Sequence, residues 1–141
     1  MRCCLPLSMA SLFALAGCGP PPTPSSTFSA LNPTLIQPTC GKFDSCHSAH
    51  GKMGGLDLQT DPYHALVDAA TQSPAYPKLK LDYPMRVVPG DPDHSAVWIK
   101  LNMSTSHDVN YGYRMPQSQL PLDAGSLAAW KGWISAGALD D

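Results

Sequence analysis

Two cysteines and a histidine, Cys40, Cys46 and His47, are the residues of this chain best suited to carry chemistry. When a histidine directly follows the second of two cysteines, the group can hold a haem covalently. The thiols add across the haem vinyl groups, and the imidazole becomes an axial ligand of the iron. Far downstream, Arg114-Met115-Pro116 places a methionine in a polar segment. A methionine thioether can supply the sixth ligand of such an iron.

The spacing of the two cysteines leaves other chemistry open. Five residues separate Cys40 from Cys46, whereas the usual attachment motif has two. A ring of this size also suits a local disulfide bond, so the pair alone fits a disulfide and a haem about equally well. His47 and His50 could complete a Cys2His2-like set for copper or zinc. Structural zinc normally takes its second ligand pair from a distant segment, which weighs against that alternative.

The N-terminus predicts export. Its apolar run from Cys3 to Ala16 is too short to remain as a membrane-spanning helix. The run ends in Leu15-Ala16-Gly17-Cys18, which is typical of a bacterial lipobox, in which the cysteine is lipidated and becomes the first mature residue. We therefore expect a signal peptide over 1–17 and a lipid anchor at Cys18; an ordinary cleaved signal peptide is the alternative. Gly19 follows rather than aspartate, which favours the outer membrane, facing the periplasm or the cell surface.

Export also narrows the roles open to the cysteines. Removal of the signal peptide takes away Cys3 and Cys4, and a lipid would occupy Cys18. Cys40 and Cys46 then remain as the only free pair in an oxidising compartment. We expect them to be bridged to each other, attached to haem or bound to metal.

The composition predicts one loop-rich domain of short helices. The chain has 15 prolines and 11 glycines in 141 residues, and only 14% of its residues are charged, with a net charge of −2. That balance offers no basic face for nucleic acid. Residues 18–27 are Pro- and Ser-rich and predict an extended tether, and the domain spans 28–141, with its packed part ending near Leu139.

The helices that must position these residues are predicted from caps and apolar spacing. The first expected helix is a short one within Phe28–Ile36, with Asn32-Pro33 as its cap and an end near Pro38. A second runs from Asp61-Pro62 through Val67, and a third begins at Asp91-Pro92 and carries Val97, Trp98 and Leu101. The last begins at Asp123 and stops at Gly137, with Leu127, Trp130 and Ile134 on its apolar face. We expect residues 73–92 to be loop with an extended piece at 85–88, and Ser104–Gln119 to be a long loop.

The order of these motifs resembles the cytochrome c-like domains of bacterial exported proteins and lipoproteins. The pieces that carry the resemblance are the helix before Cys40, Cys46-His47, Gly55-Leu56-Asp57-Leu58, Val87-Val88-Pro89-Gly90-Asp91-Pro92 with the helix to Lys100-Leu101, Arg114-Met115-Pro116, and Trp133-Ile134-Ser135-Ala136-Gly137-Ala138. The resemblance implies an all-α fold whose first and last helices cross beside the haem. It also implies a Met-Pro loop on the other side of the haem.

The resemblance assigns each site residue a role. Cys40 and Cys46 would attach haem c, His47 would be the proximal iron ligand and Met115 the distal one. Met103 and Met85 are the alternative methionines, and His107 would give bis-histidine ligation. The implied function is one-electron transfer with redox partner proteins, on a domain held to the membrane through Cys18.

A rival hypothesis keeps the same fold without haem. In it, a Cys40–Cys46 disulfide staples a binding or structural module of the envelope, and a copper site at the same residues is a further alternative. For catalysis the chain offers neither a Gly-x-Ser-x-Gly nucleophile turn nor a phosphate-binding glycine loop. We therefore expect that the protein is not an enzyme.

Overall fold

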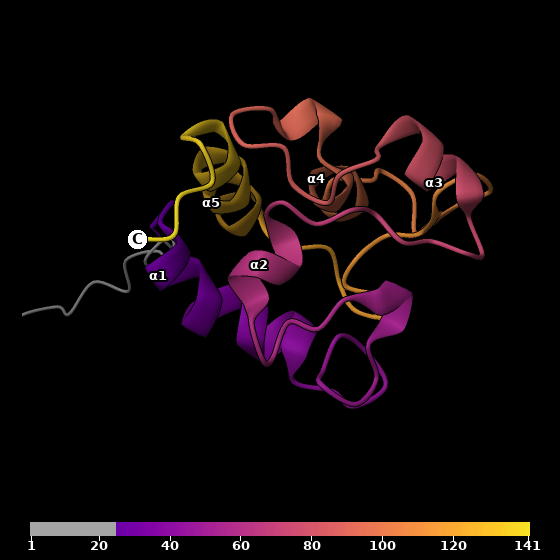
Figure 1. Ribbon diagram of the computed structural model, residues 1–141, viewed down its shortest axis with the longest axis horizontal. Helices are drawn as coiled ribbons and strands as arrows, with labels where there is room; N and C mark the ends of the chain where they lie inside the picture. Colours follow the sequence, from indigo (N-terminus) through magenta and orange to yellow (C-terminus); the bar gives the residue numbers. More distant parts are fainter. Residues whose placement is uncertain (1–24) are drawn as a thin grey trace, which may run out of the picture.

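The computed structural model describes residues 25–141 as short helices joined by loops (Figure 1). In chain order the elements are α1 (Phe28–Leu31), the π-helix η1 (Asn32–Gly41), the 3-10 turn η2 (Met53–Gly55), α2 (Pro62–Leu66), α3 (Pro77–Asp82), the 3-10 turn η3 (Pro92–His94), α4 (Ala96–Leu101), β1 (His107–Asp108), β2 (Gly112–Tyr113) and α5 (Ala124–Ser135). The expected predominance of short helices is confirmed.

The predicted export signal falls mostly outside this part of the chain. The signal peptide over 1–17 and the lipidation residue Cys18 lie outside the described residues. Thr27, the last residue of the predicted tether, accepts a hydrogen bond from the N–H of Ala30 at 3.3 Å and so caps α1. Among residues 25–141, no helix has the length and apolar character needed to cross a membrane.

The first helix is longer than the sequence predicts. Asn32 is not its cap but lies inside the helix, with φ −59° and ψ −57°, because Thr27 already caps the first turn. Pro38 does not end the helix either, because η1 continues past it as a π-helix. Proline has no N–H to give to the i→i−4 ladder, and the wider winding accommodates Pro33 and Pro38. Cys40 consequently lies in the last turn of a helix.

Aspartate caps were the most successful local predictions. Each carboxylate accepts a hydrogen bond from the N–H three residues on, which satisfies a free donor of the first turn. The pairs are Asp61–His64 at 3.3 Å, Asp91–His94 at 3.2 Å and Asp123–Ser126 at 2.9 Å. Gly137, with φ +103°, follows α5 as the sequence predicts.

The single helix expected after Asp91 is divided in two. Ser95 has extended backbone angles, φ −97° and ψ 116°, and separates η3 from α4. The Ser95 hydroxyl is fully buried, donates to the carbonyl of Asp91 at 2.7 Å and accepts from the N–H of Val88 at 2.8 Å. These bonds explain the break, because the hydroxyl serves the backbone in a conformation that a continuous helix would not allow.

The two ends of the domain pack together. Figure 1 shows α1 and α5 as neighbours, with the C-terminus close to α1. The Phe28 and Trp133 rings lie 5.5 Å apart, and the indole N–H of Trp133 donates to the carbonyl of Leu139 at 2.9 Å. The main core consists of Phe28, Leu31, Ile36, Leu58, Leu66, Val67, Val87, Trp98, Leu101, Ala129, Trp130, Trp133, Ile134 and Ala138.

The helix α3 and the β1–β2 hairpin both lie in segments that were expected to be loop. The hairpin pairs His107 with Tyr113 inside the segment expected to be loop. The Asp82 carboxylate at the end of α3 accepts bonds of 2.7 Å from Lys78 in the same helix and from the hydroxyl of Tyr111 beside the hairpin. These contacts join α3 to a segment far along the chain.

The predicted extended piece at 85–88 pairs with the chain after α2. Ala70 and Met85 form an antiparallel bridge. The N–H of Thr71 donates to the carbonyl oxygen of Pro84 at 2.8 Å, and the N–H of Arg86 donates to the carbonyl oxygen of Ala69 at 2.9 Å. Side chains alternate between the two faces of such a pair, so Thr71 and Arg86 lie on the face opposite to Ala70 and Met85.

Candidate functional site

A cavity of about 450 Å³ is lined by residues of η1, the loop after it, α4 and the segment that follows β2. This volume lies within the range of roughly 300–1,000 Å³ that is typical of small-molecule sites. Most of its wall is apolar, with Leu56, Leu58, Leu66, Leu79, Ala96, Val97, Leu101 and Trp130 among the lining residues. The cavity can therefore enclose a ligand with a large apolar surface.

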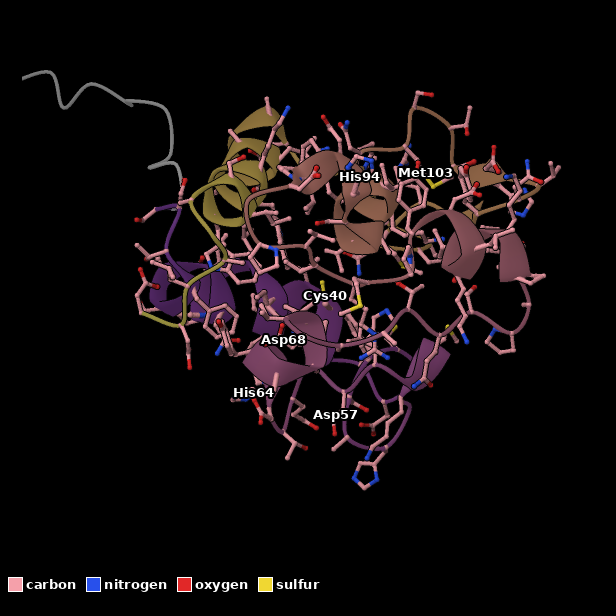
Figure 2. The ribbon with its side chains drawn as sticks, turned by 45° about the horizontal axis from the view of Figure 1, so that its top comes forward. Cys40, Asp57, His64, Asp68, His94 and Met103 are labelled. Atoms are coloured by element: carbon pink, nitrogen blue, oxygen red, sulfur yellow. The ribbon has the colours of Figure 1, made fainter. Side chains whose placement is uncertain are left out.

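All four residues predicted to hold a haem lie in the wall of this one cavity. Cys40 comes from the end of η1, Cys46 and His47 from the loop after it, and Met115 from the segment between β2 and α5. Figure 2 shows Cys40 in the middle of the molecule, whereas His64 lies at the periphery. The fold thus brings Met115 to the same cavity as Cys40, Cys46 and His47, which are far from it in the sequence.

The two cysteines are separate thiols in this structure. Burial raises the pKa of the Cys40 thiol to about 12, and the nearby Cys46 contributes in the same direction. Cys40 is therefore a neutral thiol at pH 7 and a weak nucleophile until another group activates it. The N–H of His47 donates to the carbonyl of Cys40 at 3.4 Å, which holds the loop closed between the two sulfur-bearing residues.

The His47 ring is oriented by its own loop. Its Nδ1 lies 2.9 Å from the carbonyl oxygen of Met53. A carbonyl can only accept, so Nδ1 carries the proton and Nε2 keeps a free lone pair. Burial lowers the pKa of His47, and the nearby cations Arg86 and Lys100 lower it further, against the raising effect of backbone hydrogen bonds. A neutral imidazole whose second nitrogen bonds a carbonyl is the usual state of a metal-ligating histidine.

Backbone hydrogen bonds fix the loop that carries Cys46 and His47. The N–H of Met53 donates to the carbonyl oxygen of Cys46 at 3.0 Å, and the N–H of Leu58 donates to the carbonyl oxygen of His47 at 2.7 Å. Gly51 passes so close that a Cβ at this position would lie 2.7 Å from the Cys46 carbonyl oxygen. The backbone of this loop is therefore held in place by hydrogen bonds, which fixes the positions from which the Cys46 and His47 side chains extend.

Of the three methionines considered as the distal ligand, Met115 is the one that lines the cavity. Its N–H donates to the carbonyl of Lys100 at 2.8 Å, and its half-buried side chain lines the cavity. Neither Met85 nor Met103 lines the cavity, and Met103 instead borders a separate hollow beside Asp108. Met53 does line it, a position that the sequence analysis did not consider.

The alternative histidine ligands lie elsewhere. His107 is exposed on β1, with its ring 4.7 Å from that of Tyr113, and it is not part of the cavity wall. His50 is exposed and is also outside the wall. Across residues 25–141, no three Cys, His, Asp or Glu side chains gather closely enough to hold a metal ion.

Two polar residues of the wall, Arg86 and Thr71, were missed by the sequence analysis. Arg86 is only 8% exposed and Thr71 only 4%. The available signal was one charged residue inside an apolar extended piece, Met85-Arg86-Val87-Val88. Nothing in the local sequence indicated that Thr71 would be buried beside it.

The donor set fits a covalently held haem. Two thiols, one oriented neutral imidazole and one thioether line an apolar cavity, and these are the kinds of group that haem attachment and six-coordination require. Comparisons with protein-family models, with curated proteins and with solved structures found no match to this chain.

Proposed function

We propose that this domain carries one covalently attached haem and transfers single electrons, with a cytochrome c-like arrangement of its helices. One observation carries the proposal: Met115 lines the same apolar cavity as Cys40, Cys46 and His47, although it lies far from these three residues in the sequence. The contact between α1 and α5 adds support, because the resemblance implies that the first and last helices pack together.

Each residue has a defined part in this proposal. The Cys40 and Cys46 thiols would hold the group by thioether bonds, and His47 and Met115 would be the protein ligands of its iron. A haem bound in this way supplies an iron that alternates between the ferrous and ferric states. The apolar wall keeps water away, and the methionine ligand raises the reduction potential. The lipobox that ends at Cys18 suggests that the domain is anchored to a bacterial envelope membrane and meets redox partner proteins there.

The test uses a bacterial host that has the machinery for covalent haem attachment. We expect the purified protein to show a Soret band and to keep its haem on a denaturing gel. Changing Cys40 and Cys46 together to Ser should abolish the haem that survives denaturation, and His47→Ala should remove most of it. The matched control is His50→Ala, which alters an exposed histidine in the same loop and should keep the haem.

Other outcomes point to the rival functions. A folded wild-type protein without covalent haem, in a host that loads a control cytochrome, would overturn the proposal. If Cys40 and Cys46 are then oxidised to a disulfide, the cavity belongs to a haem-free binding module. Stoichiometric copper in the purified protein would favour the copper site instead.

A further inference from the structure

Arg86 is a buried cation without an acidic partner. Its guanidinium donates to the carbonyl oxygens of Ala65 at 2.8 Å, Gly55 at 2.9 Å and Gly54 at 3.3 Å. No carboxylate of residues 25–141 lies within ion-pair distance of it. Carbonyl oxygens satisfy its N–H groups but do not neutralise its charge. A buried charge without a counter-ion is costly, so it indicates that a negative group belongs nearby.

Thr71 provides an independent sign of a missing group. Its side chain is 4% exposed, it lines the cavity, and its hydroxyl has no hydrogen-bond partner among residues 25–141. Such orphaned buried hydroxyls are rare and require an explanation. The antiparallel bridge between Ala70 and Met85 puts Thr71 and Arg86 on the same face of the paired segments. An anion bound beside Arg86 would give the Thr71 hydroxyl the acceptor that it lacks.

The charge of the cavity wall supports the same conclusion. Arg86 and Lys100 both line the cavity, and none of the aspartates that the structure describes does so. The chain as a whole has 11 acidic residues and a net charge of −2. The cavity wall therefore carries positive charge, whereas the rest of the protein carries a net negative charge. Its apolar surface and its cations together suit a ligand that is large, apolar and carboxylated.

We propose that Arg86 and Thr71 form a carboxylate-binding subsite in the cavity wall. The inference rests on the proposed function for the identity of the ligand, since a haem carries two propionate carboxylates. Arg86 supplies the positive charge, held in place by the Gly54, Gly55 and Ala65 carbonyls, and Thr71 donates its hydroxyl proton. Both residues position the ligand within the cavity and are not ligands of the iron.

Binding of free ferric haem to the haem-free protein tests this subsite. Trp130 lines the cavity, so quenching of tryptophan fluorescence reports occupancy. The probes are haemin, its dimethyl ester, in which both carboxylates are blocked, and laurate, a carboxylate without a porphyrin. We expect haemin to bind about tenfold more tightly than its ester, because a hydrogen bond to a charged group is worth roughly that factor.

Thr71→Val is the decisive variant because it removes only the unpartnered hydroxyl. We expect it to weaken haemin binding several-fold, to leave ester binding unchanged, and to leave the free protein as stable or more stable. Arg86→Lys should recover part of the haemin affinity that Arg86→Gln loses, because lysine keeps the charge without the planar geometry. The control is Thr34→Val, an exposed threonine of η1, which should change neither affinity.

The outcomes separate this proposal from the proposed function. Equal affinity for haemin and its ester, with no effect of Thr71→Val, overturns the subsite and leaves haem binding intact. Laurate binding that depends on Thr71 and Arg86, without any haemin binding, supports the subsite, and the covalent attachment experiment described above then decides the haem. If neither haemin nor laurate binds, the subsite is overturned, and the haem is again decided by covalent attachment in the bacterial host. Loss of folding in the Arg86 variants would still leave the Thr71→Val comparison to decide.

Discussion

The Nδ1 atom of His47 lies 2.9 Å from the carbonyl oxygen of Met53, six residues further along the chain. This hydrogen bond fixes the tautomer of the imidazole and leaves Nε2 with its lone pair. The loop that holds Met53 is itself bonded back to Cys46, at 3.0 Å between the Met53 N–H and the Cys46 carbonyl. The loop thus orients its histidine through its own backbone, without help from a distant segment.

Replacing Met115 should change the iron ligation without removing the haem. We expect Met115→Ala to abolish the weak near-infrared band of a methionine-ligated ferric haem and to lower the reduction potential. The measurements are absorption spectroscopy and a redox titration of the purified haem protein. Met103→Ala is the matched control, because Met103 lies outside the cavity wall and should keep the band. A band that survives in Met115→Ala would remove Met115 as the ligand.

Adding one methyl group at Gly51 should distort the loop that carries Cys46 and His47. The Cβ of Gly51→Ala would meet backbone oxygens, including that of Cys46 at 2.7 Å, and backbone cannot rotate aside like a side chain. We expect a loss of about 1–3 kcal/mol of unfolding free energy and a lower yield of haem-bearing protein. Urea unfolding and haem quantification measure these effects. Lys42→Ala, an exposed change in the same loop, should have little effect, and wild-type behaviour of Gly51→Ala would mean that the loop tolerates movement.

The junction of α1 and α5 should dominate stability. Trp133 is 1% exposed and packs on Phe28, with its indole N–H bonded to Leu139. We expect Trp133→Ala to lower the free energy of unfolding by about 3–5 kcal/mol, as is usual for a large buried aromatic side chain. Chemical denaturation followed by circular dichroism checks this value. Leu120→Ala, at a position 87% exposed, should change stability by less than about 0.5 kcal/mol. Similar values for the two variants would argue against this packing.

Asp57 should make stability depend on pH in the acid range. The N–H groups of Thr60 and Gln59 and the Thr60 hydroxyl hydrogen-bond its carboxylate, and with Lys52 nearby they lower its pKa from 3.8 to about 2. A depressed pKa stabilises the folded state above about pH 4, and this contribution disappears as the pH falls toward 2.

The Asp57→Asn variant isolates that contribution. We expect it to be less stable than the wild type at pH 6, and the difference should shrink steadily as the pH falls and vanish near pH 2. Urea unfolding curves at pH 6, 4 and 2.5 would show the trend. A difference that stays constant over this range would mean that the charge of Asp57 contributes nothing.

Local chemistry explains which parts of the fold the sequence predicted. The caps at Asp61, Asp91 and Asp123 depend on a side chain and an N–H three residues away, so the sequence contains all the necessary information. The helix α3 was missed because Asp82 is bonded to Tyr111, a contact that joins distant segments. The long first helix was missed because a proline was expected to end it, and the π-helical winding of η1 accommodates Pro38 instead.

The difference between contacts of nearby residues and contacts of distant segments also explains which residues of the candidate site the sequence predicted. Cys40, Cys46 and His47 were predicted because their chemistry is visible within eight residues of sequence, and Met115 because of its resemblance to a known loop. Arg86 was missed because its partners, the carbonyls of Gly54, Gly55 and Ala65, are 21 to 32 residues away in the chain. Only the folded chain reveals that this arginine lies in the cavity wall and lacks an acidic partner.

Trypsin digestion of the purified wild-type protein tests the central claim most directly. Lys42 lies between Cys40 and Cys46, so cleavage after Lys42 and Lys52 separates the two cysteines into different peptides. If one haem bridges both thiols, mass spectrometry will find the peptide that ends at Lys42 joined to Phe43–Lys52 through a haem, and a reducing agent will not separate them. Two haem-free peptides, or a pair that a reducing agent separates, would contradict the account.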